Sequence, residues 1–176
     1  MSDSKVKIKK LFLSKKEGKN FLKRVTAEFN FIEGIFDEKK KVQKVVFKLK
    51  DKIKTIIVID DIPAFIDVND RLIPTLTLVN LAIDKVKKIV VDSGAVPHIA
   101  RGADVMAPGI TQFDEDIGVG SLVAVLEEVH KSLIAVGEAL MSSEDLKKPG
   151  IRGKAVKNFH HVGDDAWRYI KLLSKG

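Results

Sequence analysis

Residues 94–110, GAVPHIARGADVMAPGI, restrict the backbone of this chain more than any other stretch. They include three glycines and two prolines, and Arg101 and His98 are their only basic side chains. Glycine permits sharp turns and proline removes a main-chain donor, so a long uninterrupted helix or strand is excluded here. Either the fold requires a turn at this point, or the backbone itself forms part of a binding surface.

A short helix fits residues 96–101. Pro97 suits the first helical turn, and Gly102 can supply the left-handed residue that ends the helix. His98 and Arg101 lie three positions apart, so both face outward from the same side of this helix. The stretch therefore predicts a short helix with a polar outer face.

The residues after this helix, 104–110, are predicted to form a strand. Pro108 and Gly109 leave a low, flat backbone that a ligand can approach closely. Helix and strand would then form a groove with few charges. We expect main-chain groups to contact the ligand there, and Arg101 to anchor a phosphate with its planar guanidinium.

The overall composition predicts a folded cytoplasmic protein. At 176 residues and 45% apolar content, the chain can form one domain or two small ones with buried cores. It has no apolar run long enough to cross a bilayer, and the sequence MSDSKVKIKK lacks the apolar core of a signal peptide. Cysteine is absent, which excludes disulfides, thiolate metal sites and a cysteine nucleophile.

The net charge of +7 is confined to the first half of the chain. Residues 1–85 contain 19 Lys and Arg against 12 Asp and Glu, whereas residues 86–176 contain 12 against 12. The lysines concentrate in residues 5–24 and 39–54, and Lys39, Lys41 and Lys44 are the RNA-binding candidates among them. This field favours an anionic partner, nucleic acid ahead of a membrane, although a solvated lysine surface explains it equally well. Aromatic residues are scarce, so base stacking on exposed rings is not the expected mode.

The first 85 residues predict a small basic α/β domain. Apolar spacing predicts a helix over residues 13–29. Residues 42–50 and 54–68 are rich in β-branched side chains and are interpreted as two paired strands. Arg71–Pro74 is expected to open a second helix that continues through residues 75–86, with Pro74 in its first turn.

From residue 86 to 176 the pattern changes to short β segments separated by glycine. The strand candidates are 87–91, 104–110, 121–129, SLIAVGEAL, 155–162 and 167–173. Closely spaced strands with turns between them predict a small barrel. Ser142 and Asp145 form a Ser-x-x-Asp helix start between two of these strands.

Metal sites and catalysis are not expected. His160 and His161 are adjacent, so they would point to opposite sides of a strand and could not chelate together. The acidic runs Asp60-Asp61 and Asp114-Glu-Asp116 are too short for a calcium loop and are interpreted as solvated turns. No paired carboxylates and no base beside a nucleophile appear, so neither an enzyme nor a cofactor is predicted.

The segment VDSGAVPHIARGADVMAPGI, followed by SLVAVLEE, SLIAVGEALMSSEDLKK and GKAVKNFHHVGDDAW, resembles the PUA domain, an RNA-binding module. LIPTLTLVNL is similar to the segment that precedes the PUA domain in the MCT-1 family of translation factors. The final His161, Asp165 and Trp167 also resemble that family. The resemblance implies an α+β protein in which a small N-terminal α/β domain, residues 1–85, is followed by a PUA-type β pseudobarrel, residues 86–176.

The resemblance also implies an RNA ligand and its binding residues. In PUA domains the groove between the short helix and the following strand receives RNA, which here implies His98, Arg101, Gly102, Ala103, Met106, Pro108 and Gly109. The implied ligand is the acceptor end of tRNA or small-subunit rRNA, with a role in translation initiation or ribosome recycling. The sequence lacks the cysteine pattern of eukaryotic members and an appended initiation-factor domain, so either a partner protein such as a translation factor supplies that function or the role differs.

Two other functions stay open at this stage. One is an accessory RNA-binding subunit of a tRNA- or rRNA-modifying enzyme whose catalytic chain is separate. The other is a protein-interaction module whose lysine face docks an acidic partner, with RNA incidental.

Overall fold

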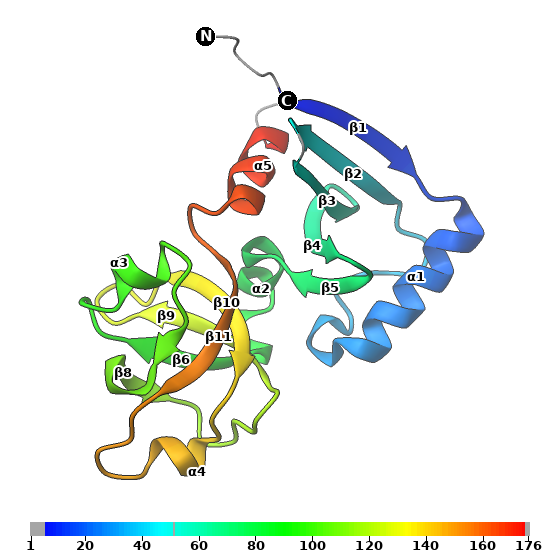
Figure 1. Ribbon diagram of the computed structural model, residues 1–176. Coiled ribbons are helices and arrows are strands. Elements are labelled where there is room, and N and C mark those ends of the chain that lie inside the picture. Colours follow the sequence, from blue (N-terminus) through cyan, green and yellow to red (C-terminus); the bar gives the residue numbers. More distant parts are fainter. Residues whose placement is uncertain (1–5, 51, 175–176) are drawn as a thin grey trace, which may run out of the picture.

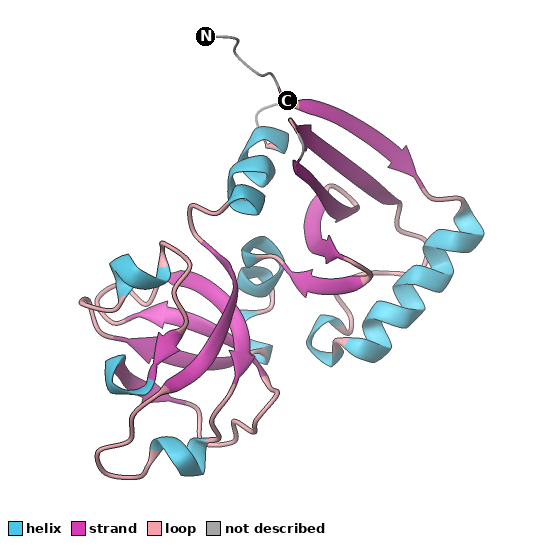
Figure 2. Cartoon of the chain, viewed as in Figure 1, coloured by secondary structure: helices cyan, strands magenta, loops and turns pink. Residues whose placement is uncertain are grey.

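The chain forms two lobes, each built on one β-sheet (Figure 1). The computed structural model describes residues 6–50 and 52–174, and positions 5 and 51 of the lysine-rich runs lie outside this range. Figure 2 shows strands in both lobes with helices at their margins. The predicted α+β class, with an N-terminal α/β unit and a PUA-type pseudobarrel, is confirmed.

The first sheet is antiparallel throughout and follows the chain order. Its strands are β1 (Lys7–Phe12), β2 (Val42–Leu49), β3 (Lys52–Ile59), β4 (Ile62–Val68) and β5 (Arg71–Pro74). The prediction of one strand over 54–68 is wrong, because Asp60 and Asp61 turn the chain into a β3–β4 hairpin. Both have left-handed backbones, φ 49° and 67°, which aspartate tolerates because its short polar side chain can bond locally.

The predicted helix at residues 13–29 forms as α1 (Lys15–Glu28). Ser14 begins it by accepting a hydrogen bond from the Glu17 main chain, and the Glu17 carboxylate accepts one from the Ser14 main chain. These bonds hold the pKa of Glu17 below its ordinary value. Leu22 and Val25 are buried against the first sheet, and the short helix η1 (Asn30–Ile32) extends the same packing.

Pro74 does not open the second helix as predicted. It ends β5, an edge strand where a missing main-chain donor leaves no ladder bond unmade. Thr75 begins α2 (Leu76–Leu81) instead, since its hydroxyl accepts from the Leu78 main chain at 3.1 Å and donates to the Pro63 carbonyl at 2.5 Å. The helix η2 (Ile83–Lys85) then leads into the second lobe.

The second sheet curls around its own core. Its strands are β6 (Lys87–Val91), β7 (Val105–Met106), β8 (Ile110–Phe113), β9 (Leu122–Glu127), β10 (Leu133–Ala139) and β11 (Lys154–His161), in the spatial order β7-β11-β10-β9-β6-β8. Only the β6–β9 pairing is parallel. The Ser142–Asp145 capping box is confirmed at the start of α4 (Ser143–Leu146).

The last element, α5 (Asp165–Leu173), is a helix, so the prediction of a strand at 167–173 is wrong. Asp164 caps it, and Ala166, Tyr169 and Ile170 are buried at helical spacing. The chain returns here to the first lobe, where α5 lies beside the first sheet (Figure 1). Tyr169 stacks on Phe47 of β2, with ring centroids 4.7 Å apart and planes 7° from parallel.

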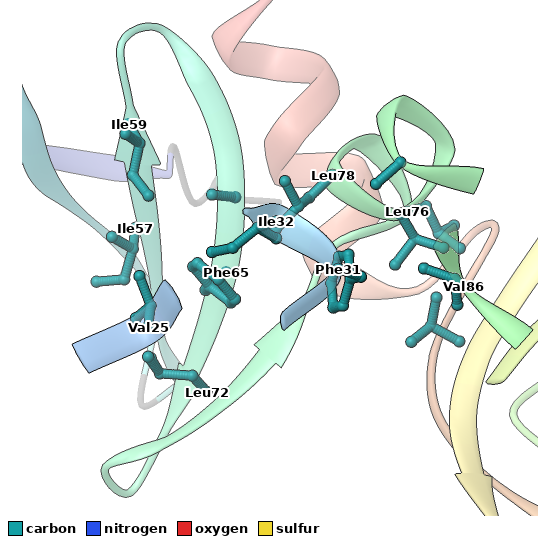
Figure 3. Packing of buried hydrophobic residues seen from close by; sticks show 14 of the residues in the cluster. Val25, Phe31, Ile32, Ile57, Ile59, Phe65, Leu72, Leu76, Leu78 and Val86 are labelled. Carbon is teal, nitrogen blue, oxygen red and sulfur yellow. The ribbon is translucent and has the colours of Figure 1, made fainter. Parts of the chain in front are cut away.

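A continuous apolar cluster joins the two lobes. It includes Val25 and Phe65 of the first lobe, Leu78 of α2, and Ala124 and Val136 of the second sheet. Figure 3 shows how Phe31, Leu76 and Val86 continue this packing between them. The division at residue 85 stays a prediction, since α5 follows the second sheet in sequence but packs on the first.

No described helix could span a bilayer. The longest, α1, has 14 residues, and none combines sufficient length with sufficient apolar character.

We expect Tyr169→Ala to lower the free energy of unfolding by about 3 kcal/mol, because it removes a buried ring stacked on Phe47. Urea denaturation measures this loss. Leu172→Ala on the same helix is the control, since Leu172 is 46% exposed and its removal should change stability by less than about 0.5 kcal/mol. Equal stability of the two variants would contradict the packing of α5 on the first sheet.

Candidate nucleic-acid interface

The stretch at residues 94–110 folds into two short helices separated by a two-residue strand. The predicted helix at 96–101 is α3 (Val96–Ile99), and the Asp92 carboxylate accepts a hydrogen bond from the Ala95 main chain just before it. Gly102 ends the turn with φ +93°. The predicted strand over 104–110 is wrong, because β7 ends at Met106 and residues 107–109 form the 3₁₀ helix η3 before β8 begins.

A groove of about 870 Å³ lies between α3 and η3. Six of the predicted RNA-binding residues line it together: His98, Gly102, Ala103, Met106, Pro108 and Gly109. Five of these six are exposed, Gly109 is half-buried, and the Met106 side chain is 48% exposed. The groove is therefore open to solvent along most of these residues.

Two glycines in the groove are also required by the fold. A Cβ on Gly109 would lie 3.2 Å from the Ala95 Cβ, so this residue lets η3 approach the start of α3 closely. Gly102 has the left-handed backbone that other residues rarely adopt, and a Cβ there would lie 3.3 Å from the His161 Nε2 atom. Because these glycines have no side chains, they permit the turn and also leave the wall of the groove low.

The charges in the groove are few and largely paired. The Asp104 carboxylate lies 2.9 Å from the Lys154 Nζ atom and also accepts a hydrogen bond from the Asn158 main chain. The bond from Lys154, followed by that from Asn158, holds the pKa of Asp104 below its ordinary value. The Asp92 carboxylate accepts a hydrogen bond from the Ala95 main-chain amide. The basic side chains that line the groove are His98 and Lys154.

Asn158 of strand β11 connects this strand to the groove by side-chain hydrogen bonds. Its Nδ2 atom donates to the Ile99 carbonyl at 3.1 Å and to the Ala103 carbonyl at 3.0 Å. These bonds hold the end of α3 and the residue that follows it. Neither Lys154 nor Asn158 was predicted from the sequence, because both lie about fifty residues from the glycine-rich stretch and only strand pairing brings them beside it.

His160 and His161 point away from each other. The His160 ring is fully buried, with its Nδ1 atom 2.7 Å from the Asp164 carboxylate, whereas His161 lies beside Gly102. Burial alone raises the pKa of Asp164, but hydrogen bonds from His160 and from two main-chain amides outweigh it and lower the pKa. Among residues 6–50 and 52–174, no group of three or more metal-ligating side chains is assembled.

Four predicted residues lie outside the groove. Arg101 is exposed next to it, and its Nη2 atom lies 3.5 Å from the Nδ1 atom of His98. Lys39 and Lys41 line a cavity in the first lobe, and Lys44 lines a second hollow beside α1. In Figure 1, α1 and α3 lie on opposite sides of the molecule, so the lysine-rich surface and the groove are separate.

The comparisons with known proteins agree with this architecture. Residues 87–162 match the family model described as the PUA domain, and residues 9–81 match one described as a domain of unknown function (DUF1947). The curled sheet with its α3–η3 groove thus defines a PUA-domain protein.

The relatives extend over most of the chain. An uncharacterized protein of Methanocaldococcus jannaschii is 38% identical, with 92% of this chain and 96% of that protein covered. Translation machinery-associated protein 20 of Eremothecium gossypii is 32% identical, with 83% and 84% covered. The chain belongs to the PUA-domain family that includes translation machinery-associated protein 20 and malignant T-cell-amplified sequence 1 (MCT-1), as the sequence resemblance predicts.

Solved structures show the same two-lobed arrangement. A hypothetical protein of Pyrococcus horikoshii is 38% identical, with a TM-score of 0.71 over 92% of this chain and 99% of that one. A PUA-domain protein of Aeropyrum pernix, solved in complex with tartrate, is 27% identical, with a TM-score of 0.77 over 94% and 92%.

We expect Asn158→Ala to loosen the groove, because the carbonyls of Ile99 and Ala103 would lose the hydrogen bonds that the Asn158 side chain donates. The free energy of unfolding should fall by about 1–2 kcal/mol. Hydrogen exchange of the Gly102 and Ala103 amides, which bond to the carbonyls of α3, should become faster. Asn80→Ala, at an exposed position of α2, is the control. Unchanged exchange at both amides would show that Asn158 does not brace the groove.

Proposed function

We propose that this protein binds RNA in the groove between α3 and η3 and that it serves translation. The observation that carries the proposal is an open groove, walled by glycine, alanine and proline, in a PUA domain. Two relatives named translation machinery-associated protein 20, each similar over more than four fifths of this chain, support the role in translation.

The groove suits a nucleotide because its wall is low and its charges are paired. A base can lie against the main chain at Gly102 and Ala103, where no long side chain stands in its way. Met106 and Pro108 supply apolar contact, and His98 supplies a ring nitrogen for a hydrogen bond. Arg101 lies at the rim, where its guanidinium can bind a phosphate of the entering strand. Recognition then depends on shape and main-chain groups more than on charge.

The lysines of the first lobe would supply affinity without selectivity. Lys39, Lys41 and Lys44 are exposed, and none forms an ion pair within the described part of the chain. Cations of this kind bind phosphates whatever the sequence and release counterions as they do so. The proposed ligand is the acceptor end of tRNA or small-subunit rRNA, with the small ribosomal subunit and a translation factor as partners.

Ala103→Glu tests the groove. A carboxylate beside Asp104 would fill the space and repel phosphate, so we expect about tenfold weaker binding of tRNA, or roughly 1.4 kcal/mol. Electrophoretic mobility shift with tRNA, intact and lacking its 3′ terminal nucleotides, measures both affinity and preference. The variant should lose any preference for the intact end, and Arg101→Ala should reduce it.

Ser132→Glu, the same charge change in the exposed turn between β9 and β10, is the matched control and should retain the preference. If Ala103→Glu binds and discriminates as the control does, the groove is not the site. Co-purification of the native protein with an RNA-modifying enzyme rather than with ribosomes would contradict the role in translation.

Replacing Lys39, Lys41 and Lys44 together by alanine tests the lysine surface. The slope of log K against log salt concentration should become shallower by about 2–3, since each phosphate contact contributes roughly 0.7–0.9. Binding should weaken equally for intact and truncated tRNA. The control triple replaces Lys131, Lys147 and Lys148 of the second lobe. Equal slopes for the two triples would exclude the proposed lysine surface.

A further inference from the structure

A cavity of about 610 Å³ opens in the first lobe, far from the PUA groove. It lies where β1 passes into α1 and where the chain approaches β2. Two main-chain bonds build it: the Leu13 amide donates to the Val42 carbonyl at 3.0 Å, and the Asp60 amide donates to the Lys41 carbonyl at 2.9 Å. Both walls are thus held by the sheet.

The floor of this cavity is apolar and its rim is cationic. Leu13, Gly18 and Val42 form the floor, where the buried Gly18 of α1 lies next to the Val42 side chain. The rim carries five lysines, Lys15, Lys19, Lys39, Lys40 and Lys41, and one carboxylate, Glu38.

Internal acids neutralise only part of this charge. Glu38 lies 2.9 Å from Lys19, and Asp60 lies 2.5 Å from Lys40. Lys15, Lys39 and Lys41 form no ion pair with any residue in 6–50 or 52–174. The amino-terminal turn of α1 is already capped by its own Ser14 and Glu17, so the field that attracts an anion comes from the lysine side chains.

An aromatic ring stands at the mouth of the cavity. Phe12, the last residue of the edge strand β1, lines the cavity and is 68% exposed. Its partner across the strand pair is the polar Gln43, so it belongs to no apolar cluster of the described structure. An exposed ring beside unpaired cations matches a ligand that has both a flat apolar face and a negative charge.

We propose that this cavity binds an unpaired nucleotide of single-stranded RNA, with the base stacked on Phe12 and the adjoining phosphates bound by Lys15, Lys39 and Lys41. A paired base has its faces covered by its neighbours, so only an unpaired one can reach the ring. An acidic peptide would satisfy the lysines but would leave the ring without a flat partner. The inference rests on the RNA ligand of the proposed function and on two of its lysines, Lys39 and Lys41, but it concerns a surface other than the PUA groove and adds a stacking site to the lysine contacts.

Fluorescence anisotropy with the full chain tests the inference. The probes are an oligouridine of about twelve nucleotides, which has no paired bases, and a blunt RNA duplex of the same length. Phe12→Ala should weaken binding of oligouridine by about tenfold and change binding of the duplex by less than about twofold, since one stacked base is worth roughly 1–3 kcal/mol. Phe12→Trp should retain binding because its ring can stack.

Three controls separate the possible outcomes. Ile53→Ala removes another exposed apolar side chain, 63% exposed on β3, and should bind both probes as the native chain does. The Phe12→Ala effect should persist in the Ala103→Glu background, so failure of the PUA groove and failure of this cavity are distinguishable. A polyglutamate peptide should compete weakly and independently of Phe12.

The inference is overturned if Phe12→Ala binds oligouridine as tightly as the native chain, or weakens both probes equally. Competition by polyglutamate that depends on Phe12 would also overturn it, in favour of an acidic protein partner. A photocrosslink from 4-thiouridine in the oligouridine, mapped by mass spectrometry to the peptide that contains Phe12, would support it.

Discussion

The apolar packing between the two sheets determines where every other feature of the protein lies. Phe31, Leu76 and Val86 fill the space between the first sheet and the strands β9 and β10, so the core of the first lobe continues into the second lobe, which also has an apolar core of its own. This burial is the main favourable contribution to folding, and it is non-directional. Directional contacts at the boundary between the two lobes add to this burial. Arg71 pairs with Glu138 at 2.8 Å, and its guanidinium lies 4.4 Å from the Phe159 ring centroid. The groove on one lobe and the lysine-lined cavity on the other are consequently held at a fixed separation.

Much of the fold could be predicted because local patterns dominate it. The apolar stripe of α1, the strand β6 and the capping box at Ser142 all follow from neighbouring residues. The errors arose where a local pattern was ambiguous. Within residues 54–68, positions 56–66 are continuously apolar apart from Asp60-Asp61, so the hairpin turn lies hidden within an apparent strand. The apolar side chains of residues 167–173 fit the period of a helix as well as that of a strand. In the folded chain, packing against Phe47 favours the helix.

The candidate site, like the fold, could be predicted only in part from the sequence. Six groove residues, from His98 to Gly109, could be named because they lie in one continuous segment that resembles the PUA domain. Lys154 and Asn158 could not, since only the pairing of β11 with β7 brings them beside α3. The scarcity of aromatic residues argues against base stacking on exposed rings, yet composition does not reveal that the Phe12 ring remains exposed. Long-range pairing and exposure are properties of the folded chain, and single-sequence patterns carry little information about either.

The return of α5 to the first sheet has a mechanical consequence. The polypeptide passes between the lobes twice, once through residues 75–86 and again between β11 and α5. A single linker would let the two lobes reorient about several axes, whereas two connecting segments allow rotation only about the line that joins them. The two lobes can therefore rotate relative to each other about one axis only, and they do not move independently.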